Sequence, residues 1–149
     1  MSEDERVKAL NALRGAQRAL IDAEDDVTQA VVDARHVKAP WRMIAEELGV
    51  AQPNAVRKYK PHLASRPART TWQGEPDPKA PALVAVRHAV RAFQDAERAE
   101  LEAVAAARNA DVTWDDIADA LGMKQPNAVA KYRPQLSVTV QVQVKPPAG

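Results

Sequence analysis

Two short runs of amide side chains are the residues of this sequence best suited to chemistry with a partner. The run Gln52-Pro53-Asn54 recurs 73 residues later as Gln125-Pro126-Asn127. A carboxamide donates and accepts hydrogen bonds at once, so it can bond bidentately to adenine, and the Arg57 guanidinium offers a similar fork to guanine. Side chains of these types can therefore form paired hydrogen bonds with a binding partner.

Each amide also has a purely structural interpretation. Asn commonly bonds to the backbone of its own turn, so Asn54 and Asn127 could serve the turn alone. Gln52 and Gln125 could be helix caps and nothing more. The sequence leaves both alternatives open.

The sequence gives little support for a catalytic, metal or cofactor site. The chain has no cysteine, which excludes disulfides, thiol nucleophiles and Cys-ligated zinc. Its three histidines occupy unrelated positions, and no glycine-rich phosphate loop occurs. We therefore expect no metal, no cofactor and no enzymatic activity. The net charge of +1 means that any DNA contact must come from local charge clusters.

An internal repeat organises the chain. Residues 9–63 align with residues 82–136 without a gap, and 28 of the 55 aligned positions are identical. We therefore expect two homologous domains, residues 1–63 and 82–136, joined by a Pro-rich linker over 64–81. Residues 137–149 form a strand and a tail in this scheme.

Each repeat opens with a long helical pattern. Ser2 followed by Glu5 is typical of a helix start, and no proline occurs from there to about Arg35. Apolar residues follow in steps of three and four, from Leu13 to Val37, and the second repeat matches them except at Glu100. This seam is either the core face of a helical domain or a pairing surface for another long helix, from the second repeat or another chain.

Each repeat closes with two shorter helices. Residues 41–48 place apolar side chains on one face, and Gly49 ends that helix, as Gly122 does in the second repeat. The next helix begins at about residue 52 or 125. We expect Pro61 and Pro134 to end it at about residues 60 and 133.

This pattern resembles the helix-turn-helix family of DNA-binding domains. Ala45, Gly49 and Val56 carry the resemblance, and it looks most like the Trp-x-x-Ile-Ala-x-x-Leu-Gly motif of actinobacterial and actinophage regulators. Val56 lies seven residues after Gly49, where the commonest pattern has six. The resemblance implies that the second short helix of each repeat lies in the major groove.

It also implies a set of DNA contacts. The amides and Arg57 would meet base edges, and the basic residues would meet phosphates, which fix position without reading sequence. The candidate residues are Lys38, Arg42, Gln52, Asn54, Arg57, Lys58, Lys60, Gln125, Asn127, Lys131 and Arg133.

The two repeats differ in charge. Residues 38–63 carry a formal charge of +3, which Arg66 and Arg69 extend, whereas residues 111–136 carry −1. We therefore expect the two shorter helices of the first repeat to bind DNA more tightly than those of the second. The acidic charge of the second repeat leaves open a protein–protein adaptor as the alternative function.

The last segment alternates Val138, Val140, Val142 and Val144 with polar residues, which is typical of a half-buried strand. Its partner would be the segment around 69–72 or the same strand of a second chain. A homodimer is expected, built from strand pairing, from packing of the long helices, or from both. The sequence thus predicts a mainly α protein with a short C-terminal strand. We expect a non-enzymatic, sequence-specific double-stranded DNA-binding protein of the cytoplasm and nucleoid, serving transcription, DNA architecture, or plasmid or phage partition.

Overall fold

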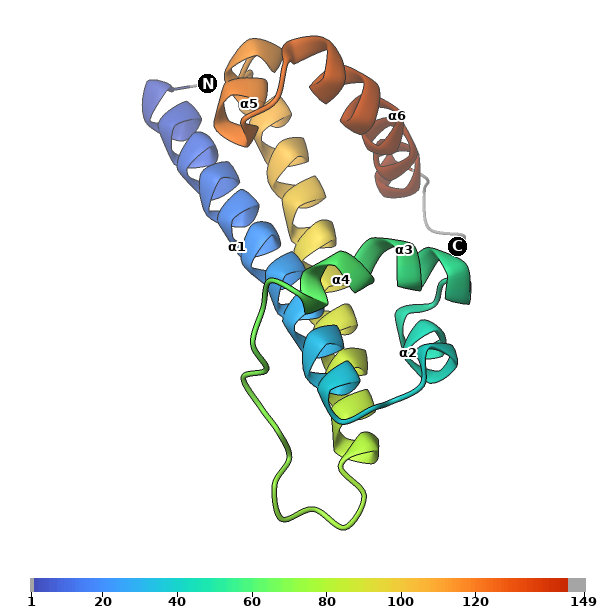
Figure 1. Cartoon of the computed structure of the whole chain (residues 1–149). Coiled ribbons are helices and arrows are strands. Elements are labelled where there is room, and N and C mark those ends of the chain that lie inside the picture. The colour runs from blue at the N-terminus through green and yellow to red at the C-terminus, as the bar shows by residue number, and fades with distance from the viewer. Residues whose placement is uncertain (1, 145–149) are drawn as a thin grey trace, which may run out of the picture. The chain divides into compact units, whose positions relative to one another are not determined.

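The computed structural model describes residues 2–144, and the side chains of residues 2–136. The described residues form six helices, shown in Figure 1: α1 (Glu3–His36), α2 (Trp41–Leu48), α3 (Gln52–Leu63), α4 (Lys79–Asn109), α5 (Trp114–Leu121) and α6 (Gln125–Val144). The mainly α fold is confirmed. The 73-residue repeat therefore appears as one long helix followed by two further helices, twice over.

Local signals set the helix ends. The backbone N–H of Glu5 donates to Oγ of Ser2 (3.2 Å), and that of Asp116 donates to Oγ1 of Thr113 (3.2 Å), so a side-chain oxygen satisfies an otherwise unpaired donor at each start. At the far end of each long helix, Lys38 and Asp111 adopt φ angles of 65° and 61°. These two residues, 73 positions apart, turn the chain toward the next helix.

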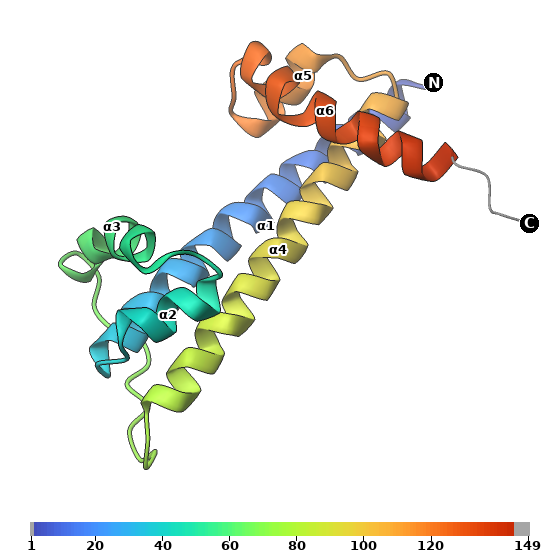
Figure 2. The same cartoon turned by 90° about the vertical axis from the view of Figure 1, so that its right-hand side faces the viewer.

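The chain divides into two compact units, and each unit takes segments from both repeats. Unit 1 comprises residues 1–20 and 96–149, and unit 2 comprises residues 21–95. In each unit a segment of α1 runs beside a segment of α4, as both views show (Figures 1 and 2). The compact units thus differ from the division into 1–63 and 82–136, which describes the repeat in the sequence.

Two apolar clusters explain this arrangement. In unit 1, Leu13 of α1 is fully buried in one cluster with Val104 and Ala107 of α4. In unit 2, Val31 of α1 shares a cluster with Val86 of α4. The apolar seam of α1 is therefore covered by α4 of the same chain. Burial of each such side chain contributes about 1.5–3 kcal/mol, which is why the pairing spans both repeats.

The two helices that follow each long helix complete the core of their unit. We call them the helix pair: α5 and α6 in unit 1, and α2 and α3 in unit 2. In unit 1 this pair adds Ile117, Leu121 and Tyr132 to the cluster, and in unit 2 it adds Ile44 and Tyr59. Trp41 and Trp114 pack against these cores while half-buried. Each pair is therefore held on the long helices by its own apolar face.

The prolines do not end the helices as expected. Pro61 lies inside α3 and Pro134 lies inside α6. Each proline removes one i→i−4 hydrogen bond, but both are exposed, so water can satisfy the carbonyl that is left over. Leu63, beyond Pro61, is half-buried, and this packing keeps the last turn of α3 in place.

The expected C-terminal strand is also wrong. The backbone of residues 137–144 continues α6, and residues 69–72, its suggested partner, form no strand. A single strand leaves its backbone groups unpaired, whereas a helix satisfies them locally. Valine disfavours a helix by only about 0.7 kcal/mol or less per residue. Strand pairing therefore gives no basis for the expected homodimer, and residues 145–149 of the tail lie outside the described residues.

The linker is irregular over residues 64–78, and α4 begins at Lys79. The expected linker over 64–81 is therefore free of helix only as far as residue 78. Pro81 lies in the first turn of α4, where its missing N–H is not needed. Within residues 2–144 no helix combines the length and apolar character needed to cross a membrane.

Candidate nucleic-acid interface

A glycine turn joins α2 to α3 and α5 to α6. Gly49 has φ 72° and Gly122 has φ 67°, a left-handed conformation that glycine adopts without a Cβ clash. The N–H of the residue after each glycine closes the turn: Val50 donates to the carbonyl of Ala45 (3.1 Å), and Met123 to that of Ala118 (2.9 Å). The two turns are therefore built alike, and both lead directly into the helices that begin with Gln-Pro-Asn.

The amide side chains stand at the first turn of α3 and of α6. The carbonyl of Ala51 accepts from the N–H of Asn54 (3.0 Å), so Ala51 is the N-cap of α3 and Gln52 is its first residue. The carbonyl of Lys124 accepts in the same way from the N–H of Asn127 (3.0 Å). The alternative that the glutamines are helix caps is therefore wrong.

The side-chain amides of these residues are not engaged in hydrogen bonds within the described structure. Within the described residues, no side-chain hydrogen bond is formed by Gln52, Asn54, Gln125 or Asn127. All four residues are exposed. The turn-stabilising interpretation of the asparagines thus has no bond to support it, and the amides are available to an external partner.

Every candidate contact is exposed, and the buried residues of α3 and α6 face the other way. Ala55 and Tyr59 are almost completely buried, as are Ala128 and Tyr132. The exposed candidates are Lys38, Arg42, Gln52, Asn54, Arg57, Lys58, Lys60, Gln125, Asn127, Lys131 and Arg133. The period of the helix therefore separates a core face from a face that carries the amides and most of the basic residues.

Lys38 and Arg42 belong to a different part of unit 2. Lys38 lies in the connection between α1 and α2, and Arg42 lies in the first turn of α2. No described contact joins either of them to the side chains of α3. They are exposed basic residues beside the helix pair and not members of its amide-bearing face.

One pair of arginines was missed by the sequence reasoning. The guanidinium of Arg35 lies over the ring of Trp41, and that of Arg108 over the ring of Trp114, each 5.1 Å from the centroid. Nη1 of Arg35 also donates to the carbonyl of Ala39 (2.8 Å).

Arg108 repeats the backbone bond at the equivalent place, donating from Nη1 to the carbonyl of Val112 (2.9 Å). Both arginines thus hold the connection between a long helix and its helix pair. Their identity at a spacing of 73 residues is the signal that could have revealed them.

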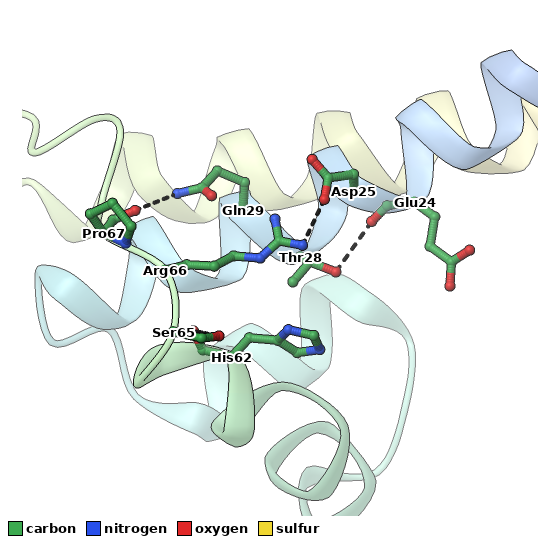
Figure 3. Close-up of polar contacts among 8 residues, drawn as sticks. All are labelled: Glu24, Asp25, Thr28, Gln29, His62, Ser65, Arg66 and Pro67. Carbon is green, nitrogen blue, oxygen red and sulfur yellow. Dashed lines mark hydrogen bonds and ion pairs between the residues drawn. The ribbon is translucent and has the colours of Figure 1, made fainter.

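The linker is fastened to α1 by polar side chains. Asp33, which is buried, accepts from the backbone N–H of Arg69 (2.9 Å) and from Nε2 of Gln29 (3.0 Å). The same Gln29 nitrogen donates to the carbonyl of Pro67 (3.0 Å), as Figure 3 shows. The second repeat has Glu102 and Ala106 in place of these two side chains. We call these hydrogen bonds of Asp33 and Gln29 the linker clasp, and the second repeat lacks the two side chains that form it.

Arg66 is part of the same clasp. Its Nη2 lies 2.6 Å from Oδ1 of Asp25 (Figure 3). The hydrogen bond from Arg66 is the largest effect and holds the pKa of Asp25 below its usual value. Burial opposes it, and the charges of Arg66, Arg69 and His62 add to the lowering. The Asp25 carboxylate offsets the charge of Arg66, so the basic run beyond α3 is weaker than the sequence suggested.

Comparison of the chain with protein-family models, with curated proteins and with solved structures gave no match.

Proposed function

We propose that this chain binds double-stranded DNA in a sequence-dependent way, through the amide-bearing ends of α3 and α6. The observation that carries the proposal is the pair of exposed Gln-Pro-Asn turns, whose side-chain amides form no hydrogen bond within the described residues. Exposed amides at a helix N-terminus suit the major groove, which admits a helix and presents adenine to a bidentate amide.

The charges around α3 support the same proposal. Arg57, Lys58 and Lys60 are exposed on α3, and α3 itself carries no acidic residue. α6 offers Lys131 and Arg133, with alanine in place of Arg57. Phosphate neutralisation supplies a large share of DNA affinity, so α3 is the stronger contact in this proposal and α6 the weaker one.

The biological use that we propose is transcriptional regulation at a site with two related halves, and a nucleoid location follows from it. A DNA-architectural or partition role would use the same contacts. The one rival from another class is a protein–protein adaptor. It is favoured by three exposed aspartates of α5, Asp115, Asp116 and Asp119, which would repel phosphate.

The test begins with selection of bound sequences from random duplex DNA at physiological salt. We expect an enriched repeated half-site. Asn54→Ala should then weaken binding to that site about 5- to 150-fold and relax the preference at one base pair, because a bidentate amide contributes about 1–3 kcal/mol of discrimination. Asn127→Ala should relax the equivalent base pair of the other half-site, with a smaller loss of affinity.

Asn109→Ala is the matched control, since Asn109 is an exposed asparagine at the end of α4 and outside both amide-bearing turns. Base preference that is unchanged in both Asn54→Ala and Asn127→Ala, with the fold intact, would contradict the proposed readout. Failure to enrich any sequence, together with capture of a protein that Asp115→Asn and Asp119→Asn release, would favour the adaptor.

A further inference from the structure

Unit 2 contains a pocket that the proposed DNA contacts do not use. It has a volume of about 490 Å³ and lies between the end of α1, the end of α3 and the linker. Pockets that hold small organic molecules commonly measure about 300–1,000 Å³. The clasp formed by Asp33 and Gln29 fastens the linker against α1, so the wall that the linker supplies is held in place.

The charged side chains of the lining are two arginines, Arg35 and Arg66. Arg35, His36, Arg66 and Thr71 line the pocket, and no carboxylate is among its lining residues within the described chain. Asp25 offsets the charge of Arg66 through one guanidinium nitrogen, Nη2 (Figure 3). No described carboxylate offsets the charge of Arg35 by an ion pair. The electrostatic balance of the lining therefore favours an anion.

Arg35 provides the most specific observation. Its Nη1 donates to the carbonyl of Ala39 and its guanidinium lies over Trp41, so the group is fixed in orientation. Arg35 is one of the residues that line the pocket, so a carboxylate bound there can approach the charge of its guanidinium.

The rest of the lining is apolar. Val32 and Leu63 face the pocket from α1 and α3, and Ala68 faces it from the linker. An inorganic anion would gain nothing from these side chains, whereas an organic acid can place a hydrocarbon body on them and its carboxylate near the arginines.

We propose that this pocket binds a small organic monocarboxylate, with the carboxylate at Arg35 and the hydrocarbon part against Val32, Leu63 and Ala68. Unit 1 serves as an internal comparison. Arg108 repeats the backbone bond and the tryptophan contact of Arg35, but the backbone of residues 139–144, which follow at the same spacing, continues α6 as a helix, whereas residues 66–71 are irregular. The proposal does not depend on DNA binding, and its test contains no DNA.

The experiment is a titration of the full chain with benzoate, followed by the backbone amide NMR signals of Leu63, Ala68 and Thr71. We expect saturable shifts at these amides, and binding at least tenfold weaker for benzamide, the uncharged analogue of the same shape. Sodium sulfate at equal ionic strength should not reproduce the shifts. Equal binding of benzoate and benzamide, or no saturable shift with benzoate or hexanoate, would overturn the proposal.

Variants then locate the site. Arg35→Gln should weaken benzoate binding at least tenfold, whereas Arg108→Gln, which removes the equivalent backbone bond and ring interaction in unit 1, should leave it within twofold. Ala68→Leu narrows the pocket without removing a polar group and should also weaken binding at least tenfold, so it decides the matter if Arg35→Gln does not fold. Unchanged binding in folded Arg35→Gln, or in Ala68→Leu, overturns the assignment.

Discussion

The hydroxyl of Tyr132 donates a hydrogen bond to Oε1 of Glu100 inside unit 1, and both residues are buried, at 3% and 2% exposure. Oε2 of Glu100 is also buried and has no partner within the described residues. The equivalent residues in unit 2 are Tyr59 and Val27, which lie together in an apolar cluster. Unit 1 therefore carries a buried polar pair where unit 2 has apolar packing.

The first prediction concerns this pair. Tyr132→Phe should destabilise the protein by about 1–3 kcal/mol, because it leaves a buried carboxylate without a donor. Adding Glu100→Val, which copies Val27 of the other repeat, should recover most of that loss, since removing both polar partners can be nearly neutral. Urea unfolding of the two single variants and the double variant measures the coupling. Tyr59→Phe is the control, and a loss as large as that of Tyr132→Phe would contradict the pairing.

The second prediction is the alkaline response of Tyr132. Burial, and then the hydrogen bond and charge of Glu100, raise the pKa of the Tyr132 phenol above its usual value of about 10. The unfolded chain therefore releases this proton first as the pH rises. The stability that Tyr132 contributes is complete below about pH 10 and declines above it.

Wild-type protein should consequently lose stability faster than Tyr132→Phe between about pH 9.5 and 11. The measurement is urea unfolding at several pH values in that range. Parallel pH profiles for the two proteins would show that the phenol is not held in its neutral form.

The third prediction concerns the ion pair between α2 and α4 in unit 2. Nε of Arg87 lies 2.8 Å from Oε2 of Glu47, and Nη2 lies 2.8 Å from Oε1, so the pair is bidentate. The hydrogen bond from Arg87 is the largest effect and holds the pKa of Glu47 below its usual value. Burial opposes it, and the charge of Arg87 adds to the lowering. A lowered pKa stabilises the fold above the unfolded value of about 4.3, and this contribution disappears as the pH falls.

Glu47→Gln should therefore be slightly less stable than wild type at pH 7, by about 1 kcal/mol or less, because the arginine is half-exposed. The difference should shrink between about pH 5 and 3. Thermal unfolding of wild type and Glu47→Gln across this pH range measures the difference. Glu46→Gln, which changes the exposed neighbouring residue, is the control. A difference that is constant with pH would indicate that the substitution disturbs packing and does not act through charge.

The fourth prediction concerns the left-handed residues after the long helices. Lys38 has φ 65°, which disfavours a residue with a Cβ, and the N–H of Ala39 bonds back to Ala34 (2.9 Å) to fix the turn. Lys38→Gly should stabilise the protein by about 0.5–1 kcal/mol, because relief of this strain exceeds the added freedom of the unfolded chain.

Asp111→Gly, at the equivalent position, should gain less, since aspartate tolerates this conformation better than lysine. Gly49→Ala tests the same effect in reverse and should destabilise. The midpoint of urea unfolding at an unchanged m-value is the measurement. A loss of stability in Lys38→Gly would mean that the lysine side chain contributes more than its backbone strain removes.

The fifth prediction concerns the salt dependence of DNA binding. If Lys58 and Lys60 contact phosphates, their replacement by alanine should reduce the slope of log affinity against log salt by about 0.9 for each phosphate that is no longer neutralised. Lys79→Ala, an exposed lysine at the start of α4, should leave the slope unchanged. A slope that does not change in the double variant would show that these lysines do not touch the backbone of DNA.

The sequence by itself determined the local structure. The repeat, the helix starts at Ser2 and Thr113 and the glycine turns at Gly49 and Gly122 depend on residues a few positions apart, so their signals are readable without the fold. The exposure of the Gln-Pro-Asn turns also follows from the helical period. The same local reasoning failed over residues 137–144, because alternating valines favour a strand only where another strand is present to pair with it.

Tertiary structure alone decided which segments share a core. The pattern of α1 offers one apolar face along 34 residues, and nothing in that pattern says which segment of the chain covers each end. Leu13 shares one buried cluster with Val104, and Val31 shares another with Val86. Burial of apolar surface stabilises such contacts between segments far apart in the sequence. The linker clasp at Asp33 and the buried pair of Glu100 and Tyr132 depend on the same long-range contacts, so no local signal predicts them.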